Sequence, residues 1–260
     1  MIRARALGLF RALAVPVTVL VLYELWFRLT GQDSDTLAPP SAAFSAFLEA
    51  VRDGTLATAT GQTFASLLSG LAIGGGLGLA SGLVIGFSRR ADDASFLAIE
   101  MLRPIPSVAL LPLALMIFGF GYRMEIFVVA FATFWPFLIL TQSAVRQVEP
   151  RLIEVSRILG LKPLSAARDI VLPAAAPRLM TALRLGTGIA LVVAVTCEIA
   201  SNPQGLGHAL MLSQETLRPA RMWAFLFWIG AIGLTLNLSL LRLERWLFAH
   251  RGDYDASVAT

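Results

Sequence analysis

Six long apolar segments leave this chain few folds to adopt. Hydrophobic residues make up 57% of its 260 residues and its mean hydropathy is +0.73, whereas soluble domains are about 45–50% apolar. A helix needs about 20 mainly apolar residues to cross a bilayer. The sequence therefore predicts an all-α membrane protein with six transmembrane helices. They are expected at about 12–29, 64–87, 94–119, 126–140, 179–199 and 223–241.

The first apolar segment has two interpretations. Basic residues precede it, which is also the layout of a secretory signal. However, Glu24 and Arg28 interrupt the apolar run, and the following residues 31–35 are a poor cleavage region. We therefore expect a retained anchor helix.

The basic residues predict the orientation of the chain in the membrane. Six spans place both termini on the same side. Most of the 21 Lys and Arg residues fall on that side, in the termini, around 89–103 and in the polar stretch 146–184. The positive-inside rule makes this side cytoplasmic.

The second apolar segment carries a glycine at every fourth position. These are Gly70, Gly74, Gly78, Gly82 and Gly86. In lipid, small residues let helix backbones approach closely and so mark packed faces. Steps of four residues drift by about 40° each around the helix, so we expect more than one neighbouring helix to cross this ridge. Packing within the subunit is favoured over contact with a second copy.

The third segment contains two prolines, Pro104 and Pro106, which are expected to kink it because each removes a backbone hydrogen bond. A short turn is predicted before it, at 88–93. Arg103 costs about 2.5–3.5 kcal/mol at mid-membrane, so it should lie near the cytoplasmic surface or face a wet cavity.

The most polar long stretch of the chain runs from Glu154 to Pro173. Its first part has a helical apolar pattern, and Gly160 follows as a stop, because glycine takes the left-handed cap conformation without steric cost. A second short helix is predicted from Pro163, ending at Leu172-Pro173. We expect a helix–turn–helix that docks onto another surface.

This stretch resembles the EAA loop of ABC-importer permeases. The resemblance rests on Glu154, Gly160 and the Ile170-x-Leu172-Pro173 ending; at Val155 and Ser156 the family usually has alanines. In the family, this loop contains the coupling helix, which seats in a groove of the ATPase subunit. The alternative is an amphipathic helix lying on the membrane surface. The resemblance assigns ATPase coupling to Glu154, Val155, Ser156, Gly160, Leu161, Ile170, Leu172 and Pro173.

Residues 102–106 (Leu-Arg-Pro-Ile-Pro), with Leu111-Pro112 and 118–121, resemble the nitrate/sulfonate/taurine branch of these permeases. The resemblance implies a type I ABC importer permease fold with a cytoplasmic coupling helix, in the bacterial inner membrane, with both termini cytoplasmic. The expected divisions are an N-terminal anchor helix and periplasmic segment at 1–60, the permease domain at 61–241 and a cytoplasmic tail at 242–260.

The resemblance also implies partners. They are two cytoplasmic ATP-binding subunits, which would carry ATP and Mg²⁺, a periplasmic solute-binding protein, and a second copy of the chain in a homodimer. The expected solute is a small anion such as a sulfonate, taurine or nitrate.

The residues show no catalytic constellation, and the resemblance implies a transport subunit without its own ATPase site. No phosphate-binding loop is present, so the chain is not expected to bind ATP or another cofactor. His208 and His250 are far apart in the sequence, and neither has other potential metal ligands at a suitable spacing. Cys197 is the single cysteine. The net charge of +4 does not indicate a nucleic-acid partner, because the location of the basic residues matters more than the size of the charge.

Candidate residues for a translocation path or gate come from polar groups and prolines within the apolar segments. Glu198 either lines a vestibule or external gate, or it reaches the interface or pairs structurally, because a carboxylate at membrane depth is costly. Two other classes of function stay open: an ATP-independent channel or secondary carrier, and a membrane scaffold for a partner enzyme. The candidate set is Arg103, Pro104, Pro106, Gln142, Glu198 and Asn237.

Overall fold

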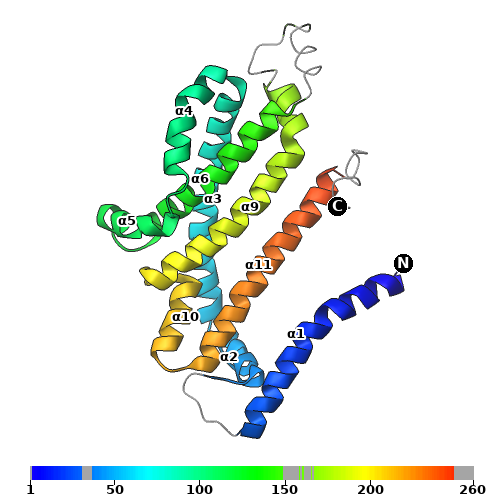
Figure 1. The fold of residues 1–260 in the computed structure, drawn as a ribbon. Helices are drawn as coiled ribbons and strands as arrows, with labels where there is room; N and C mark the ends of the chain where they lie inside the picture. The colour runs from blue at the N-terminus through cyan, green and yellow to red at the C-terminus, as the bar shows by residue number, and fades with distance from the viewer. Residues whose placement is uncertain are drawn as a thin grey trace.

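The computed structural model describes residues 2–30, 37–148, 158, 160, 165 and 167–248, with the backbone alone for 2–13, 16 and 167. Every regular element in this part of the chain is helical. The helices are α1 (Ile2–Thr30), α2 (Pro40–Arg52), α3 (Thr55–Phe87), α4 (Arg89–Leu102), a 3₁₀ helix η1 (Ser107–Leu110), α5 (Leu111–Phe118), α6 (Tyr122–Arg146), a π-helix η2 (Ala167–Val171), α9 (Leu172–Ala200), α10 (Gly205–Glu215) and α11 (Pro219–Phe248) (Figure 1).

Four of the described helices are long and apolar enough to cross a membrane: α3, α6, α9 and α11. A fifth span is possible if α4 and the η1–α5 segment are counted together, although they meet at an angle of 81°. The break holds Pro104 and Pro106, as the predicted kink requires. The remaining long helix, α1, covers the segment from which the first span was predicted.

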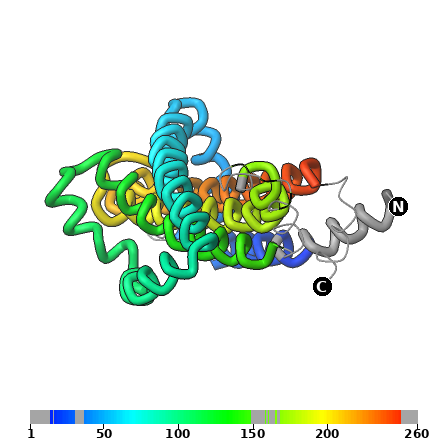
Figure 2. The backbone as a smooth tube through the Cα atoms, turned by 90° about the horizontal axis from the view of Figure 1, so that it is seen from above, coloured from blue at the N-terminus to red at the C-terminus, as the bar shows by residue number. Residues whose placement is uncertain are grey.

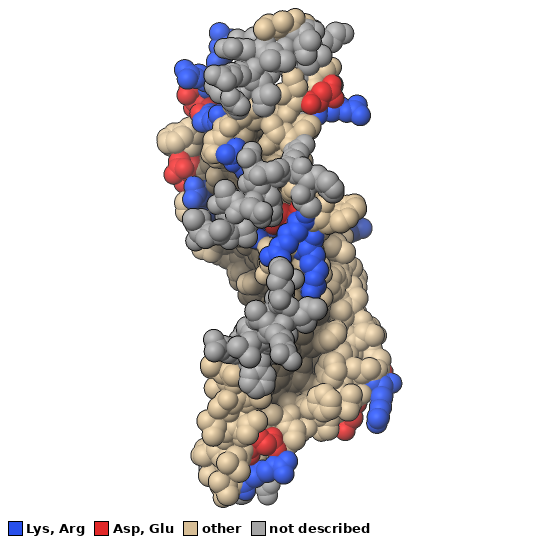
Figure 3. Space-filling model, turned by 90° about the vertical axis from the view of Figure 1, so that its right-hand side faces the viewer, with Lys and Arg blue, Asp and Glu red and all other residues tan. Residues whose placement is uncertain are grey.

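The core lies where α3, α6 and α9 pack together, and α10, α11 and α2 close its lower end (Figure 1). Its largest fully buried apolar side chains include Leu67, Met124, Leu206 and Phe225. α5 projects sideways from these helices in the ribbon of Figure 1 and in the tube of Figure 2. Figure 3 shows one face of the molecule, with charged side chains in its upper half and at its lower end and an uncharged band between them. Such a band suits a lipid environment.

The glycine ridge of α3 packs along a single helix, α6. A Cβ atom at Gly70 would meet Val129, one at Gly78 would meet Phe137, and one at Gly86 would meet Val145. Gly74 and Gly82 face α6 as well. The expectation that several neighbours cross the ridge was therefore wrong. Rows of residues four apart run obliquely along a helix surface, and a partner inclined along that row stays in contact throughout. The expectation of packing within the subunit is confirmed.

The turn between α3 and α4 is shorter than predicted. Instead of a loop over 88–93, α3 ends at Phe87 and α4 begins at Arg89. Ser88 lies between them in an extended conformation, and its hydroxyl accepts a hydrogen bond from the backbone N–H of Ala91. A serine at the N-cap satisfies an amide that has no partner within the helix, so one residue is enough to start α4.

Leu172-Pro173 does not end a helix, contrary to the prediction. The π-helix at 167–171 runs directly into α9, and Pro173 occupies the first turn of that helix. Proline is tolerated there because the first amides of a helix have no partner inside it. The polar stretch therefore leads straight into a membrane-length helix.

The N-terminal helix α1 is tied to α2 by a carboxylate. Glu24 accepts hydrogen bonds from the backbone N–H of Ser41 at 3.0 Å and from its hydroxyl at 2.8 Å, and it also pairs with Arg28. The N-cap residue of α2, Pro39, offers no side-chain cap. Glu24 therefore serves the amide of the first turn of α2 from outside the helix.

Candidate functional site

Part of the predicted coupling set can be placed. Glu154, Val155, Ser156 and Leu161 lie outside the described residues. Gly160 is exposed and has φ +62°, so its predicted left-handed conformation is confirmed. Ile170 lies in the π-helix, while Leu172 and Pro173 form the first turn of α9.

A small apolar cluster joins the beginning of α9 to the end of α6. Val171 packs with Val145 and Val148, all of them buried, and Leu83 of α3 lies against them. The polar stretch thus connects at this end with three of the long helices. A displacement of the stretch would reach α9 through a continuous backbone and α6 through these side chains.

A hydrogen bond and an ion pair join α6 to α4 near the same end of α6. The Nε2 atom of Gln142 donates to Oδ1 of Asp92 at 2.6 Å, and Nη2 of Arg146 lies 2.5 Å from Oδ2 of the same residue. Arg146 is the last residue of α6. Gln142, which is predicted as a pathway residue, also holds α4 against α6 in this structure.

The remaining pathway candidates are not gathered in one place. Arg103 is exposed at the break after α4, and its Nη1 atom lies 3.9 Å from Oε1 of Glu100. Pro104 and Pro106, in the same break, are exposed as well. Asn237 is exposed on α11. Glu198 lies in the last turn of α9, and at 1.5 Å per residue this is roughly 40 Å from Leu172.

Glu198 is buried, with only 2% of its surface exposed, so its side chain does not reach outward to the interface. Its Oε2 atom accepts a hydrogen bond from the backbone N–H of Gly207 at 2.8 Å. Beside it is Glu125, which is fully buried in the first turn of α6. The Nδ2 atom of Asn202 donates to Oε2 of Glu125 at 2.6 Å.

Sequence reasoning missed Glu125 and Asn202. Glu125 lies just before the span predicted at 126–140, but α6 begins at Tyr122 and takes Glu125 into its first turn. The available signal was an acid between Met124 and Ile126 at the edge of an apolar run. The partnership with Glu198 joins residues 73 positions apart, so no local pattern could indicate it.

Side chains of α3 complete this cluster at the beginning of α10. Gln62 accepts from the backbone N–H of Gly205 at 2.9 Å, and the Thr63 hydroxyl accepts from that of Leu206 at 3.0 Å. With the bond from Gly207 to Glu198, three amides of the first turn of α10 have partners from outside that helix. Gly205 has φ +91° and adjoins the Glu198 carboxyl, which leaves no room for a side chain.

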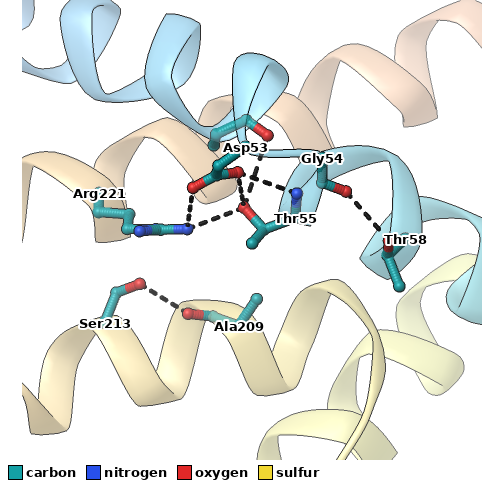
Figure 4. A network of polar contacts seen from close by, with 8 residues as sticks. Asp53, Gly54, Thr55, Thr58, Ala209, Ser213 and Arg221 are labelled. Carbon is teal, nitrogen blue, oxygen red and sulfur yellow. Dashed lines mark hydrogen bonds and ion pairs between the residues drawn. The ribbon is translucent and has the colours of Figure 1, made fainter.

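A second polar network joins the α2–α3 connection to α11 (Figure 4). The Thr55 hydroxyl and backbone N–H donate to Asp53 Oδ1 at 2.6 and 2.9 Å, and Arg221 Nη2 lies 3.0 Å from Asp53 Oδ2. The two bonds from Thr55, followed by the guanidinium of Arg221, hold the pKa of the Asp53 carboxyl below its ordinary value. This network fixes α11 to the end of the bundle that carries α10.

The chain combines membrane-length helices with a polar stretch that precedes α9 and contains a glycine in the left-handed conformation. Its sequence matches a known family. The model of the binding-protein-dependent transport system inner membrane component covers residues 72–251. The chain belongs to this family. It is therefore a permease subunit of an ABC importer, a multi-pass membrane protein that works with ATPase and solute-binding partners, and ATP hydrolysis belongs to a separate subunit.

Curated relatives of this permease match it over most of its length. The putative aliphatic sulfonates transport permease protein SsuC of Bacillus subtilis is 27% identical over 95% of this chain and 90% of the relative. The bicarbonate transport system permease protein CmpB of Synechococcus elongatus is 30% identical over 72% of this chain and 68% of the relative. The predicted resemblance to the nitrate/sulfonate branch is thus confirmed.

The fold matches a solved ABC importer as well. A chain from the inward-facing MetNI methionine ABC transporter superimposes with a TM-score of 0.59 and 19% identity, covering 70% of this permease and 93% of that chain. The prediction of a type I importer permease fold is confirmed.

Proposed function

We propose that this permease moves a small anion, such as a sulfonate, taurine or nitrate, into the cell. The observation that carries the proposal is the match over nearly the whole chain to a permease named for aliphatic sulfonates, supported by one named for bicarbonate. Both of these named solutes are small anions. Solute selection in such systems lies largely with the binding protein, so the permease needs only a path that admits its class.

The proposed assembly is a homodimer with two cytoplasmic ATP-binding subunits. One copy offers one Glu154–Pro173 stretch, whereas two ATPases must be engaged. Both termini and this stretch are assigned to the cytoplasmic side of the inner membrane, on the distribution of basic residues. The divisions 1–60, 61–241 and 242–260 are proposed as the anchor with its periplasmic segment, the permease domain and a cytoplasmic tail.

The proposed coupling set carries the motion of the ATPases into the spans. The part that docks onto the ATPase consists of Glu154, Val155, Ser156, Gly160 and Leu161. The part that connects it to α9 consists of Ile170, Leu172 and Pro173. The continuous helix from 167 to 200 and the packing of Val171 on α6 support this role. Closure of the ATPases would then switch the subunit between two rigid packings.

In the same proposal, Glu198 is a gate residue at the end of α9 remote from the ATPases. Its support is its burial and its bond to α10, which together make α10 move with α9. Arg103, Pro104, Pro106, Gln142 and Asn237 are retained as pathway candidates with less support, because they lie apart from Glu198.

Uptake into proteoliposomes tests the proposal. The full permease is reconstituted with its ATPase subunit and solute-binding protein, and entry of labelled taurine, an alkanesulfonate, nitrate or bicarbonate is followed. We expect uptake of one of these anions that requires ATP and both partners. ATP-dependent uptake of a neutral or cationic solute alone would overturn the anion assignment.

The same assay separates the two other classes of function. An ATP-independent channel or carrier predicts uptake by the permease without the ATPase, and a scaffold predicts no solute flux under any condition. Either result with a folded, fully assembled complex would contradict the proposal.

A further inference from the structure

Two buried carboxyl groups meet where α6, α9 and α10 come together. Glu125 is fully buried and Glu198 is 2% exposed. Asn202 brings the two groups together, because its Nδ2 atom donates to Glu125 Oε2 at 2.6 Å while its backbone N–H donates to the carbonyl of Cys197, the neighbour of Glu198, at 3.1 Å. They come from different helices: Glu125 from the first turn of α6 and Glu198 from the last turn of α9. The contact is therefore a tertiary one that links the ends of two membrane-length helices.

In each carboxyl group one oxygen accepts a short hydrogen bond, and the other has no partner with ordinary hydrogen-bond geometry among the described residues. Oε2 of Glu125 accepts from Asn202, and Oε2 of Glu198 accepts from Gly207. Oε1 of Glu125, Oε1 of Glu198 and Oδ1 of Asn202 are buried and have no hydrogen-bond partner among the described residues. Asn202 is 1% exposed. A buried polar atom without a partner destabilises the folded state, and this cluster holds three such atoms.

No cation balances the pair in the described part of the chain. None of the ion pairs found there includes Glu125 or Glu198. From α3 the cluster receives only the neutral side chains of Gln62, Thr63 and Ser66. The other titratable groups nearby are the buried Cys197 thiol on α9 and, along an adjoining pocket of about 340 Å³, His208 and Glu215 of α10. Arg123 of α6 is exposed.

We propose that Glu125 and Glu198 form a proton-binding site in which the two carboxyl groups share a single proton. The proton turns one carboxyl group into a donor and leaves the other as its acceptor, so the pair carries one negative charge instead of two. Two adjacent carboxylates in a buried site cannot both be ionised without a large repulsion. The site stabilises the junction of α6, α9 and α10, and removal of the proton loosens it.

The experiment compares full-length permease in lipid nanodiscs with the variants Glu125→Gln and Glu198→Gln. A glutamine amide donates to the remaining carboxylate, as the shared proton does, and needs no proton from solvent. We expect the Tm of the wild type to fall by at least about 3 °C between neutral and alkaline pH, while the Tm of either variant stays level. Glu215→Gln makes the same change at an exposed acid of α10 and should follow the wild type. Equal alkaline slopes in the wild type and in Glu125→Gln would overturn the proposal.

Infrared spectroscopy keeps the test decisive if one variant folds poorly. The wild type at neutral pH should show the carbonyl stretch of a protonated carboxylic acid, which disappears on alkaline titration and is absent from a folded single variant. A wild-type spectrum without this band at neutral pH would overturn the proposal. So would an alkaline Tm that sodium chloride restores and choline chloride does not, because a metal cation would then occupy the site in place of the proton.

Discussion

The backbone N–H of Gly207 donates to Oε2 of Glu198 over 2.8 Å, so the first turn of α10 is bound to the last turn of α9. This close approach depends on glycine. A Cβ atom at Gly207 would collide with the carbonyl oxygen of Val195 and lie 2.8 Å from Cβ of Glu198. Both obstacles are backbone or near-backbone atoms that cannot rotate away.

Replacing Gly207 with alanine should therefore destabilise the permease. Overpacking typically costs about 1–3 kcal/mol, and we expect a fall in Tm in nanodiscs of about 2–10 °C. The matched control is Gly188→Ala on α9, where an added Cβ meets no atom of the described residues within 4 Å. Equal Tm values for the two variants would contradict the packing described for α9 and α10.

The glycine ridge offers a second pair of alanine variants. A Cβ atom at Gly74 would meet the backbone carbonyl of Ala130 and the Thr133 hydroxyl. One at Gly76, two residues along the same helix, meets nothing within 4 Å in the part of the chain that the structure describes. Gly74→Ala should separate α3 from α6 and lower the Tm, again by the few degrees typical of overpacking. Gly76→Ala should leave the Tm unchanged or raise it slightly, because alanine favours helix over glycine. A melting experiment that ranked them in the opposite order would refute the α3–α6 contact.

The positions of these helices could largely be predicted from hydropathy, because a membrane span requires a long apolar run. Their partners could not. The spacing of Gly70 to Gly86 indicates a packed face but does not say that α6 alone lies along it. Likewise, Leu172-Pro173 fits the end of one helix as well as the first turn of another, and only the continuous backbone into α9 decides between them.

The candidate site was predictable where its residues are local in sequence. The left-handed conformation of Gly160 follows from its place after a helical pattern. The pairing of Glu125 with Glu198, and the amides of α10 that Gln62 and Thr63 satisfy, depend on contacts between segments 9 to more than 100 positions apart. Such contacts are set by tertiary packing and leave no mark in a single sequence.

The network at Asp53 predicts a stability that depends on pH. The pKa of this carboxyl is lowered in the folded state by the bonds from Thr55 and the charge of Arg221. Its contribution is therefore present above the ordinary pKa of an aspartic acid and is lost as the pH falls through the lowered value. Asp53→Asn should have a lower Tm than the wild type at neutral pH, and the two curves should converge in acid. A Tm difference that stayed constant down to acidic pH would rule out this role.

Replacing Gly160 should give a permease that folds but no longer transports its solute. The φ of +62° at this glycine costs other residues about 1–2 kcal/mol, and no atom of the described residues lies within 4 Å of an added Cβ. Gly160→Val should thus reach the membrane in normal amount but lose ATP-driven uptake, because the turn before α9 is altered. Gly160→Asn, which tolerates the left-handed conformation, should keep most of the uptake. Full uptake by the valine variant would remove this turn from the coupling set.

The most direct measurement concerns the side of the membrane on which the polar stretch lies and what touches it. Cys197, the single cysteine, is buried, so a membrane-impermeant thiol reagent will report on an introduced cysteine. Arg168→Cys lies at an exposed position just before α9, and Arg52→Cys is the matched exposed control at the end of α2. We predict labelling of Arg168→Cys only in inside-out vesicles and less of it when ATPase subunits are bound, with Arg52→Cys labelled only from the outside. Labelling of Arg168→Cys from the outside, or no protection by the ATPase, would contradict the account of a permease driven through this stretch.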